Sequence, residues 1–201
     1  MRNIIIISGP SGCGKSTLIH MLLGEFPELQ FSVSHTTRPP RPNEVDGRDY
    51  HFVSETRFAA MVRDGRFAEK AAVHGHHYGT SWHEIRAKSG QGRILVLDID
   101  VQGARSIKAK FPEAMAIFVV PPTLAALKKR LRQRQQQLDH EARRRLAAAM
   151  KELRAYPLYD YVVVNNDVAS ALADLCCLVV AFRLQRTRSA GQVRKLLRPK
   201  P

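Results

Sequence analysis

Cysteine, long apolar runs and acidic residues are all scarce in this sequence. Three cysteines among 201 residues, Cys13, Cys176 and Cys177, form no disulfide framework, which predicts a reducing compartment such as the cytoplasm. No apolar run approaches the ~18 residues that a membrane-spanning helix requires, so we expect no membrane partner. No cleavage site of small residues follows the N-terminus, so we expect no signal peptide.

Acidic residues are scarce mainly in the second half of the chain. Residues 101–201 carry 20 Lys and Arg against 7 Asp and Glu, whereas residues 1–100 carry 12 against 11. The excess lies at 128–154 and at 183–201, and the latter segment has seven basic residues and no acidic one. This asymmetry indicates a polyanionic partner, either a nucleic acid or a nucleoside triphosphate.

Apolar runs bounded by turn residues alternate with helical patterns. Such runs predict buried parallel strands, and the alternation predicts an α/β fold whose mainly parallel sheet is flanked by helices. The segment 31–93 breaks the alternation with short strand-like pieces, Pro, Gly and polar residues, which indicates an inserted substrate lobe. The predicted strands are Asn3–Ser8, Ile94–Asp98, Ala116–Val120 and Tyr161–Asn165, and the predicted helices are at about 15–24, 101–110, 123–134, 139–155 and 168–185.

The stretch GPSGCGKST, residues 9–17, has the spacing of a P-loop. It follows a buried strand and precedes a helix, which is the context that the motif requires. Glycines let successive backbone N–H groups turn toward one anion, and the helix adds its positive N-terminal end. The loop therefore predicts a site for ATP, with Lys15 on the β- and γ-phosphates and the Ser16 hydroxyl on Mg²⁺. Its residues are Gly9, Pro10, Ser11, Gly12, Cys13, Gly14, Lys15, Ser16 and Thr17.

Cys13 lies inside this loop and has two interpretations. A helix N-terminus can lower the pKa of a thiol and make it reactive. The alternative, which we favour, is a small filler residue at a variable position of the loop. Alkylation with and without ATP distinguishes the two.

From Thr36 onward the sequence reads TTRPPRPNEVDGRDYHF, which resembles the signature of the guanylate kinase family. The stretches FAEKAAVHGHHYGTS (67–81), ILVLDIDVQGA (94–104) and YDYVVVNND (159–167) resemble later blocks of that family, so the resemblance extends from about residue 3 to 170. The signature positions are Thr36, Thr37, Arg38, Arg41, Glu44, Gly47, Tyr50 and Phe52.

The resemblance implies transfer of the γ-phosphate of ATP to GMP. Arg38 and Arg41 offer two planar guanidinium groups for the dianionic phosphate of GMP, and Tyr50 and Tyr78 can donate further hydrogen bonds. A carboxylate at Glu69 can accept hydrogen bonds from the adjacent N1 and N2 donors of guanine. Adenine would instead place its N1 acceptor opposite this carboxylate, and the two would repel. By resemblance Ser34 donates to O6, and Thr80 and Asp98 complete the pocket.

The stretches RLRQR (130–134) and ARRRLAAAMKEL (142–153) resemble the lid of the same family. By position Arg134 and Arg145 contact the transferring phosphate, and Asn165 lies near the adenine of ATP. The sequence departs from the family at Gln135, where glycine is common. The other arginines of these stretches, Arg130, Arg132, Arg143 and Arg144, are interpreted as a solvated helical face.

These assignments divide the chain into a core at about 1–33, 94–125 and 157–185, a GMP-binding lobe at 34–93 and a lid at 126–156. A basic tail at 186–201 is expected to be mobile. Asp98 and Asp100 end a buried strand, where ligands collect in open α/β sheets. Asp98 is expected to contact nucleotide, and Asp100 to act structurally or on Mg²⁺ through water.

Several alternatives stay open. The chain could be a non-catalytic protein-interaction module of the same fold, although its P-loop is intact. Its tail could bind nucleic acid, although no recognition motif supports this. The histidines of HGHHYG (74–79) could hold zinc, although ligand partners at suitable spacing are missing. Cys176 and Cys177 are expected to pack in the core, and the sequence leaves monomer or homo-oligomer undetermined.

Overall fold

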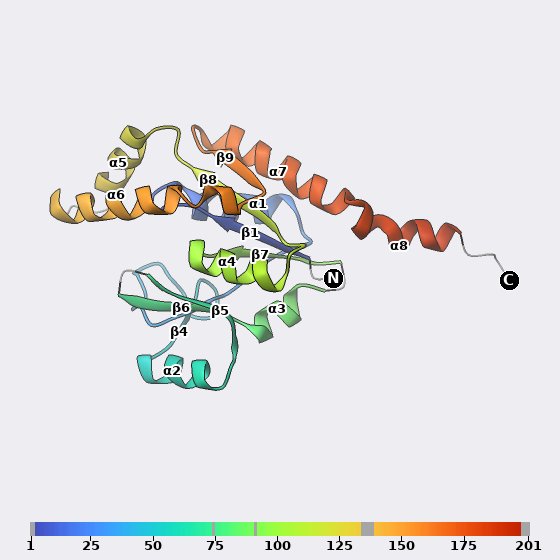
Figure 1. Cartoon of the computed structure of the whole chain (residues 1–201), viewed down its shortest axis with the longest axis horizontal. Coiled ribbons are helices and arrows are strands. Elements are labelled where there is room, and N and C mark those ends of the chain that lie inside the picture. The colour runs from blue at the N-terminus through green and yellow to red at the C-terminus, as the bar shows by residue number, and fades with distance from the viewer. Residues whose placement is uncertain (1–2, 74, 91, 134–138, 198–201) are drawn as a thin grey trace.

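A five-stranded parallel sheet forms the centre of the computed structural model (Figure 1). The structure describes residues 3–73, 75–90, 92–133 and 139–197, without the side chains of 133, 139–145 and 192. The α/β fold with a mainly parallel sheet is therefore confirmed. The strands, in spatial order, are β2 (Leu29–Phe31), β7 (Ile94–Asp98), β1 (Ile4–Ser8), β8 (Met115–Val120) and β9 (Tyr161–Val164).

Helices cover both faces of this sheet, which explains the continuous apolar run in β1. Ile5 and Ile7 belong to one core cluster, under α1 (Lys15–Glu25) and α7 (Val168–Leu184). Ile4 and Ile6 belong to a second cluster, under α3 (Trp82–Lys88) and α4 (Val101–Lys110). All four isoleucines are fully buried. A central strand covered on both faces has no solvent-facing position, so its sequence does not alternate.

The segment between β2 and β7 forms a separate lobe below the sheet in Figure 1. Its own four-stranded sheet has the order β4-β3-β6-β5. Strand β6 pairs antiparallel with both β3 and β5, while β3 and β4 are parallel. The elements are β3 (His35–Thr36), β4 (His51–Phe52), α2 (Glu55–Arg63), β5 (Phe67–Val73) and β6 (His76–Ser81), followed by α3.

Two further helices, α5 (Leu124–Gln133) and α6 (Asp139–Leu153), follow β8. They pack on each other through a small apolar cluster of Leu127, Leu131 and Ala149. A short 3₁₀ helix, Tyr156–Leu158, leads from α6 back to β9. The two helices therefore form a unit, and α5 contacts the loop after β1, since Arg130 donates to the Cys13 carbonyl. This is where the sequence predicts a lid.

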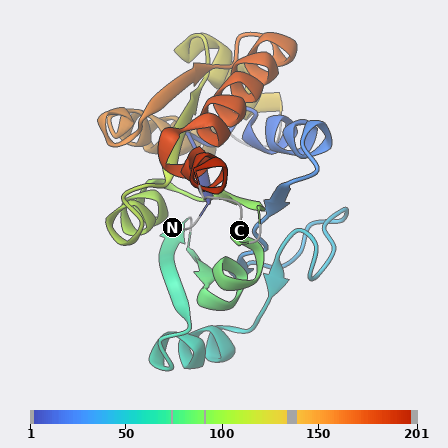
Figure 2. The same ribbon diagram turned by 90° about the vertical axis from the view of Figure 1, so that its right-hand side faces the viewer.

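The basic tail contains a helix that the sequence did not predict. Residues Arg186–Leu196 form helix α8, which projects from the body beyond α7 (Figures 1 and 2). Its first turn is fixed by Arg188, whose Nη2 donates to the Glu113 carbonyl at 3.1 Å. The Arg188 guanidinium also lies 3.6 Å from the centroid of the Phe182 ring. Composition alone misses such a contact, because it treats every arginine of a basic tail as solvated.

Helix α7 is apolar nearly all round. By length and composition the helical segment Val168–Leu196 could pass for a membrane span, since an 18-residue stretch of it has a mean hydropathy of 1.7. Leu175, Val179 and Phe182 are nevertheless fully buried, so one face of α7 packs on the core. Cys176 packs partly against that core, but Cys177 is exposed. The prediction of core packing is therefore wrong for Cys177, which lies on the outer face.

The half-buried His35 predicts how stability depends on pH. The ring centroids of His35 and His51 are 4.6 Å apart, and within the described part of the chain the buried Nδ1 of His35 has no hydrogen-bond partner. Burial, and then the charge of His51, lower the pKa of His35 from 6.5 to about 4. As pH falls, His35 is therefore protonated in the unfolded chain before it is protonated in the folded one. The contribution of neutral His35 to the free energy of unfolding is complete above pH 6.5 and is lost as pH falls toward 4.

We expect His35 to contribute to that loss, by less than the full pKa shift would give, because solvent screens a half-buried side chain. In His35→Phe, the free energy of unfolding should fall less between pH 7 and pH 4 than in the unmodified chain. Urea unfolding at several pH values measures this, with the exposed His20→Asn as control. If the free energy of unfolding of His35→Phe fell between pH 7 and pH 4 as much as that of the unmodified chain, this role of His35 would be contradicted.

Candidate active site

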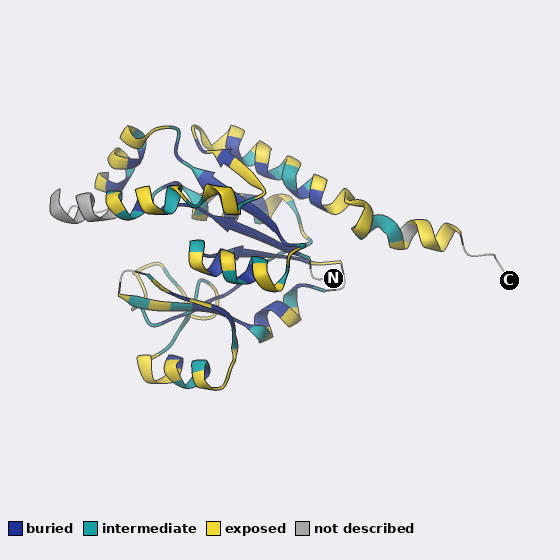
Figure 3. Cartoon of the chain, in the orientation of Figure 1, coloured by how far each residue is buried: buried dark blue, intermediate teal, exposed yellow. Residues whose placement is uncertain are grey.

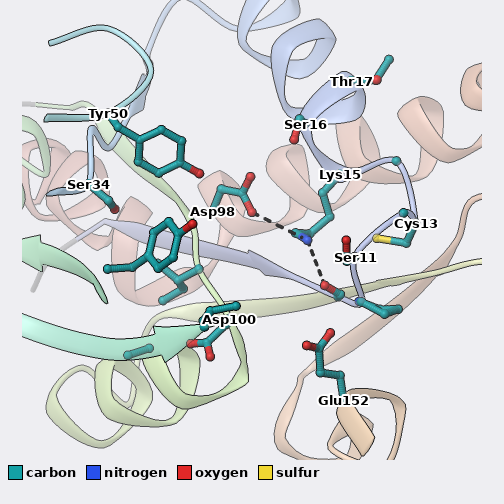
Figure 4. Close-up of a pocket in the computed structure, with 18 of the residues that line it drawn as sticks. Ser11, Cys13, Lys15, Ser16, Thr17, Ser34, Tyr50, Asp98, Asp100 and Glu152 are labelled. Atoms are coloured by element: carbon teal, nitrogen blue, oxygen red, sulfur yellow. Dashed lines mark hydrogen bonds and ion pairs between the residues drawn. The ribbon is translucent and has the colours of Figure 1, made fainter. Parts of the chain in front are cut away.

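A cleft of about 550 Å³ lies where the core, the lobe and the α5–α6 unit meet (Figure 4). The whole stretch from Gly9 to Thr17 lines it, together with side chains from the lobe and from both lid helices. Segments far apart in the sequence thus face one space. The remaining lining residues are Ser34, Arg41, Tyr50, Glu69, Ala71, Val73, Tyr78, Asp98, Ile99, Asp100, Arg130 and Glu152.

The loop between β1 and α1 has the conformation that its glycines allow. Gly12 and Gly14 have φ values of 86° and 92°, in the left-handed region that side chains rarely adopt. A Cβ at Gly14 would also lie 2.4 Å from Nδ2 of Asn165. The loop ends directly in α1, which begins at Lys15. The N–H groups of its first turn and the positive end of α1 are thus available to an anion in the cleft.

Lys15 lies between the loop and the end of β7. Its Nζ donates to the Gly9 carbonyl at 2.8 Å and is 3.9 Å from Oδ1 of Asp98 (Figure 4). Burial raises the pKa of Asp98, and the charge of Lys15 acts in the opposite direction. The ammonium group is therefore held at the loop by contacts that a phosphate can replace.

Cys13 is fully buried beneath the loop. Burial raises the pKa of its thiol, and the nearby charge of Lys15 only partly opposes this. A thiolate is the reactive form of cysteine, so this environment disfavours reaction. The structure thus supports the interpretation of Cys13 as a filler residue.

Asn165 and Arg130 support the loop from the side of the sheet edge. The Asn165 side chain donates to the Cys13 carbonyl at 2.8 Å and is buried, so it does not line the cleft. The Arg130 guanidinium donates to the Asn165 carbonyl at 3.1 Å and to that of Cys13 at 3.4 Å. The sequence interpretation of Arg130 as part of a solvated face is therefore wrong. Arg130 follows the buried Leu127 by three residues, a spacing that places it on the inward side of α5 and could have revealed this.

Glu69 is the most enclosed carboxylate of the lobe, at 5% exposure. Its Oε1 accepts from the backbone N–H of Thr80 at 2.8 Å and from the Thr80 hydroxyl at 2.6 Å. The Thr80 hydroxyl is in turn 3.2 Å from that of Ser34. Burial raises the pKa of Glu69, and the hydrogen bonds from Thr80 oppose the rise. Thr80 does not line the cleft itself, but it fixes the orientation of the carboxylate that does.

Gly103 of α4 leaves room for this carboxylate. A Cβ at Gly103 would lie 2.7 Å from Oε2 of Glu69. In a helix Ala is otherwise favoured over Gly by about 1 kcal/mol. We therefore expect Gly103→Ala to keep the fold but to displace Glu69, raising the KM for the lobe's nucleotide by about tenfold with little change in the KM for ATP. Steady-state kinetics measure both, and equal changes in the two KM values would contradict a specific role of this contact.

Arg38 and Arg41 share one acceptor in the lobe. Nη2 of Arg38 donates to both carboxylate oxygens of Glu44 at 2.8 Å, and Nη1 of Arg41 is 3.5 Å from the same group. Arg41 lines the cleft and its side chain is 63% exposed, whereas Arg38 lies behind Tyr50 and Tyr78. The structure thus brings the two arginines together at Glu44, with Arg41 the more accessible of the two. Burial raises the pKa of Tyr50, which keeps its hydroxyl a proton donor.

Two further acidic residues, Asp100 and Glu152, line the cleft near the loop (Figure 4). Asp100 caps α4, since its Oδ1 accepts from the Gly103 N–H at 2.8 Å. Glu152 comes from α6, and burial raises the pKa of its carboxyl while Lys15 lowers it. Glu152 was not predicted from the sequence. Its position three residues after the buried Ala149 places it on the inward face of α6, which is the signal that could have identified it.

Part of the predicted site lies beyond what the structure describes. Arg134 and Gln135 are outside the described residues, and Arg145 belongs to α6 without a described side chain. His74 of the HGHHYG stretch is also outside them. Among the described residues no group of His, Cys, Asp and Glu has the arrangement of a metal site. His77 instead stacks on Phe58 and lies 3.7 Å from Glu55.

The fold and the site together define a class of protein. A P-loop follows the first strand of a parallel sheet, and a lobe with a polar pocket and two arginines faces it across one cleft. This arrangement is typical of P-loop nucleoside monophosphate kinases, in which two phosphorylated nucleotides meet end to end.

Comparison with known proteins identifies the family. The model of the guanylate kinase family matches residues 1–181. The chain is 44% identical over 195 residues to guanylate kinase of Legionella pneumophila (strain Lens), covering 97% of this chain and 93% of that one. It is 46% identical over 185 residues to guanylate kinase of Thiobacillus denitrificans, covering 92% and 88%. The crystal structure of guanylate kinase from Anaplasma phagocytophilum aligns with a TM-score of 0.78 at 29% identity, covering 93% and 89%. The chain therefore belongs to the guanylate kinase family.

Proposed function

We propose that this chain transfers the γ-phosphate of ATP to GMP, giving ADP and GDP, with the residue roles described below. The observation that carries the proposal is the single cleft, which P-loop residues line on one side and a buried, oriented Glu69 lines on the other. One space thus offers a triphosphate cradle and a purine-reading carboxylate. We further propose that the enzyme acts in the cytoplasm, where it recycles purine nucleotides.

The GMP half of the cleft has a separate group for each part of the nucleotide. Glu69 accepts from N1 and N2 of guanine, while the Ser34 hydroxyl faces O6. Arg41 and Arg38 bind the phosphate, which replaces Glu44 as their acceptor, with Tyr50 and Tyr78 beside them. Thr80 positions Glu69, and Asp98 closes the pocket toward Lys15.

The ATP half consists of the loop and the lid. Lys15 neutralises the β- and γ-phosphates, and backbone N–H groups of Gly12 to Ser16 surround them. Arg130 stabilises the loop together with Asn165, and both lie on the side where the adenine is expected. Arg134 and Arg145 reach the transferring phosphate when the lid closes, which also excludes water.

Mg²⁺ is the implied cofactor, and the donors present fit it. The exposed Ser16 hydroxyl lines the cleft next to Lys15, and Asp100 lies within the same cleft as a hard oxygen donor that can act through water. When bound, the ion neutralises charge on the phosphates of ATP. Ser16 would hold it directly.

Arg41 tests the division between the two halves. Arg41→Met should lower kcat/KM for GMP by about 100-fold, because the phosphate loses a guanidinium ligand, while the affinity for ATP stays nearly unchanged. Coupled kinetics give the first quantity and a fluorescent ATP analogue gives the second. Loss of both to the same extent would show that the two halves are not separate.

The acceptor specificity tests the function itself. We expect ADP release in a coupled assay to be at least 10³-fold faster with GMP than with AMP, UMP or CMP at equal concentration, because an unpaired buried polar group discriminates strongly. Comparable rates with AMP would contradict the proposal. Absence of turnover with all four would favour the non-catalytic module instead.

A further inference from the structure

The outward part of helix α8 combines exposed apolar and basic side chains. Leu196 and Leu197 are 85% and 77% exposed, and Val193 is 53% exposed. Arg194 and Lys195 are exposed beside them, and Arg186–Leu196 contains no acidic residue. At 100° per residue, Val193, Leu196 and Leu197 fall within one arc of the helix and Arg194 borders it. The helix therefore presents an apolar stripe flanked by positive charge.

The orientation of this stripe is fixed by the opposite side of the helix. Arg188 holds the first turn to the body through Glu113, Asn3 and the ring of Phe182. Arg188 lies more than a third of a turn from the centre of the arc that contains Val193 and Leu197. The apolar stripe thus points away from the body, and Figure 3 shows the outer part of α8 exposed beyond an intermediate stretch at 188–190.

The preceding helix continues the apolar character. α7 carries only two charged residues, Asp174 and Arg183, yet one face of it is buried. Cys177 and Leu184 lie exposed on its outer side, with Leu184 at 68%. A helix that is apolar all round normally has a partner on every side. The C-terminal helices therefore expose apolar surface next to a strong positive charge.

We propose that α8, with the adjoining end of α7, binds the surface of an anionic lipid bilayer. Basic residues would interact with acidic headgroups while Val193, Leu196 and Leu197 enter the boundary of the acyl chains, as in amphipathic helices that lie in the interface plane. This is attachment to a surface, not a membrane span, because the inner face of α7 stays packed on the core.

The chemistry of the helix selects this occupant over two others. A second copy of α8 would bring basic residues against basic residues without an acidic partner in Arg186–Leu196. A nucleic acid would gain the phosphate contacts, but Val193, Leu196 and Leu197 offer neither hydrogen bonds nor aromatic stacking to bases. An anionic bilayer satisfies both the charge and the apolar stripe.

The position of α8 leaves the catalytic cleft accessible. In Figure 1 the lid helices α5 and α6 lie at one end of the molecule, and α8 projects at the other. Substrates and the moving lid therefore stay clear of a surface bound at α8. Activity on nucleotides in solution and attachment to a bilayer are thus independent properties of the chain.

Sedimentation of the full-length chain with lipid vesicles tests the proposal. We expect binding to vesicles of phosphatidylglycerol and phosphatidylcholine, little binding to phosphatidylcholine alone, and release at high salt. Arg194→Gln/Lys195→Gln should weaken binding by about 30-fold, since each basic residue contributes about fivefold near an anionic surface. Leu196→Ser/Leu197→Ser should weaken it by at least about tenfold, because apolar burial is lost.

Matched controls separate this surface from general charge and from the kinase activity. Arg57→Gln/Arg63→Gln removes two exposed charges from α2 of the lobe and should leave vesicle binding unchanged. The α8 variants should retain the kcat of the unmodified chain, which shows that they are folded. Equal binding to neutral vesicles, binding unaffected by the α8 variants, or no vesicle binding would each overturn the proposal. So would retention on duplex DNA, or self-association in sedimentation velocity, without vesicle binding.

Discussion

Glu69→Gln should lower kcat/KM for GMP by about 10³-fold, because a buried polar site loses its pairing with the substrate. Oε1 of Glu69 already accepts two hydrogen bonds from Thr80, so the other oxygen and the remaining lone pairs face guanine. An amide has only one acceptor oxygen. In the variant, an NH₂ group must therefore oppose either the donors of Thr80 or those of guanine. Coupled kinetics with GMP varied at saturating ATP measure the loss.

The same substitution should not destabilise the fold. Burial raises the pKa of Glu69, so a neutral amide removes the cost of burying a charge. We expect a melting temperature equal to or above that of the unmodified chain and an unchanged KM for ATP. Glu55→Gln, at a carboxylate with a 61% exposed side chain, serves as the control. A loss for GMP below tenfold would remove Glu69 from its role as the guanine reader.

Lys15→Met should lower kcat by about 10³-fold, because a preorganised positive charge at the transferring phosphate is lost. Methionine retains much of the length of the lysine side chain without its charge. The Lys15 ammonium group is held at the loop by the Gly9 carbonyl and Asp98, so it needs little rearrangement to meet a phosphate. Single-turnover measurements of GDP formation isolate this step from product release.

Lys70→Met, at an exposed position of β5, is the matched control and should retain full activity. Burial of Asp98 without its cationic neighbour raises the pKa of that carboxyl further. The pH dependence of the remaining activity should therefore change in Lys15→Met. A reduction in kcat below tenfold would mean that backbone N–H groups alone provide the electrostatic stabilisation.

The sequence predicts the core of the fold because its signals there are local. An apolar run directly before a glycine loop strongly predicts a buried strand. The expected strand Asn3–Ser8 is observed as Ile4–Ser8. Strand β2 was not predicted, because three residues of mixed burial give no periodic signal. Helix α8 was not predicted because its fixation depends on Arg188 meeting Phe182 and Glu113, which are distant or unremarkable in the sequence.

The same limit applies to the site. Residue types and spacing predict which side chains converge, and the P-loop, Tyr50, Glu69 and Asp98 do line one cleft. They do not predict which of those residues contact the nucleotide and which only hold another residue in place. Asn165 lies under the loop, not in the cleft, and Thr80 orients Glu69 from behind. Such distinctions depend on the packing of α5 and β9 against the loop, which no single motif contains.

A crystal structure of the chain with GMP tests the central claim most directly. The account predicts the guanine ring in the lobe, with N1 and N2 within hydrogen-bonding distance of the Glu69 carboxylate and the phosphate against Arg38 and Arg41. A guanine ring bound away from Glu69, with the phosphate elsewhere in the cleft, would contradict it.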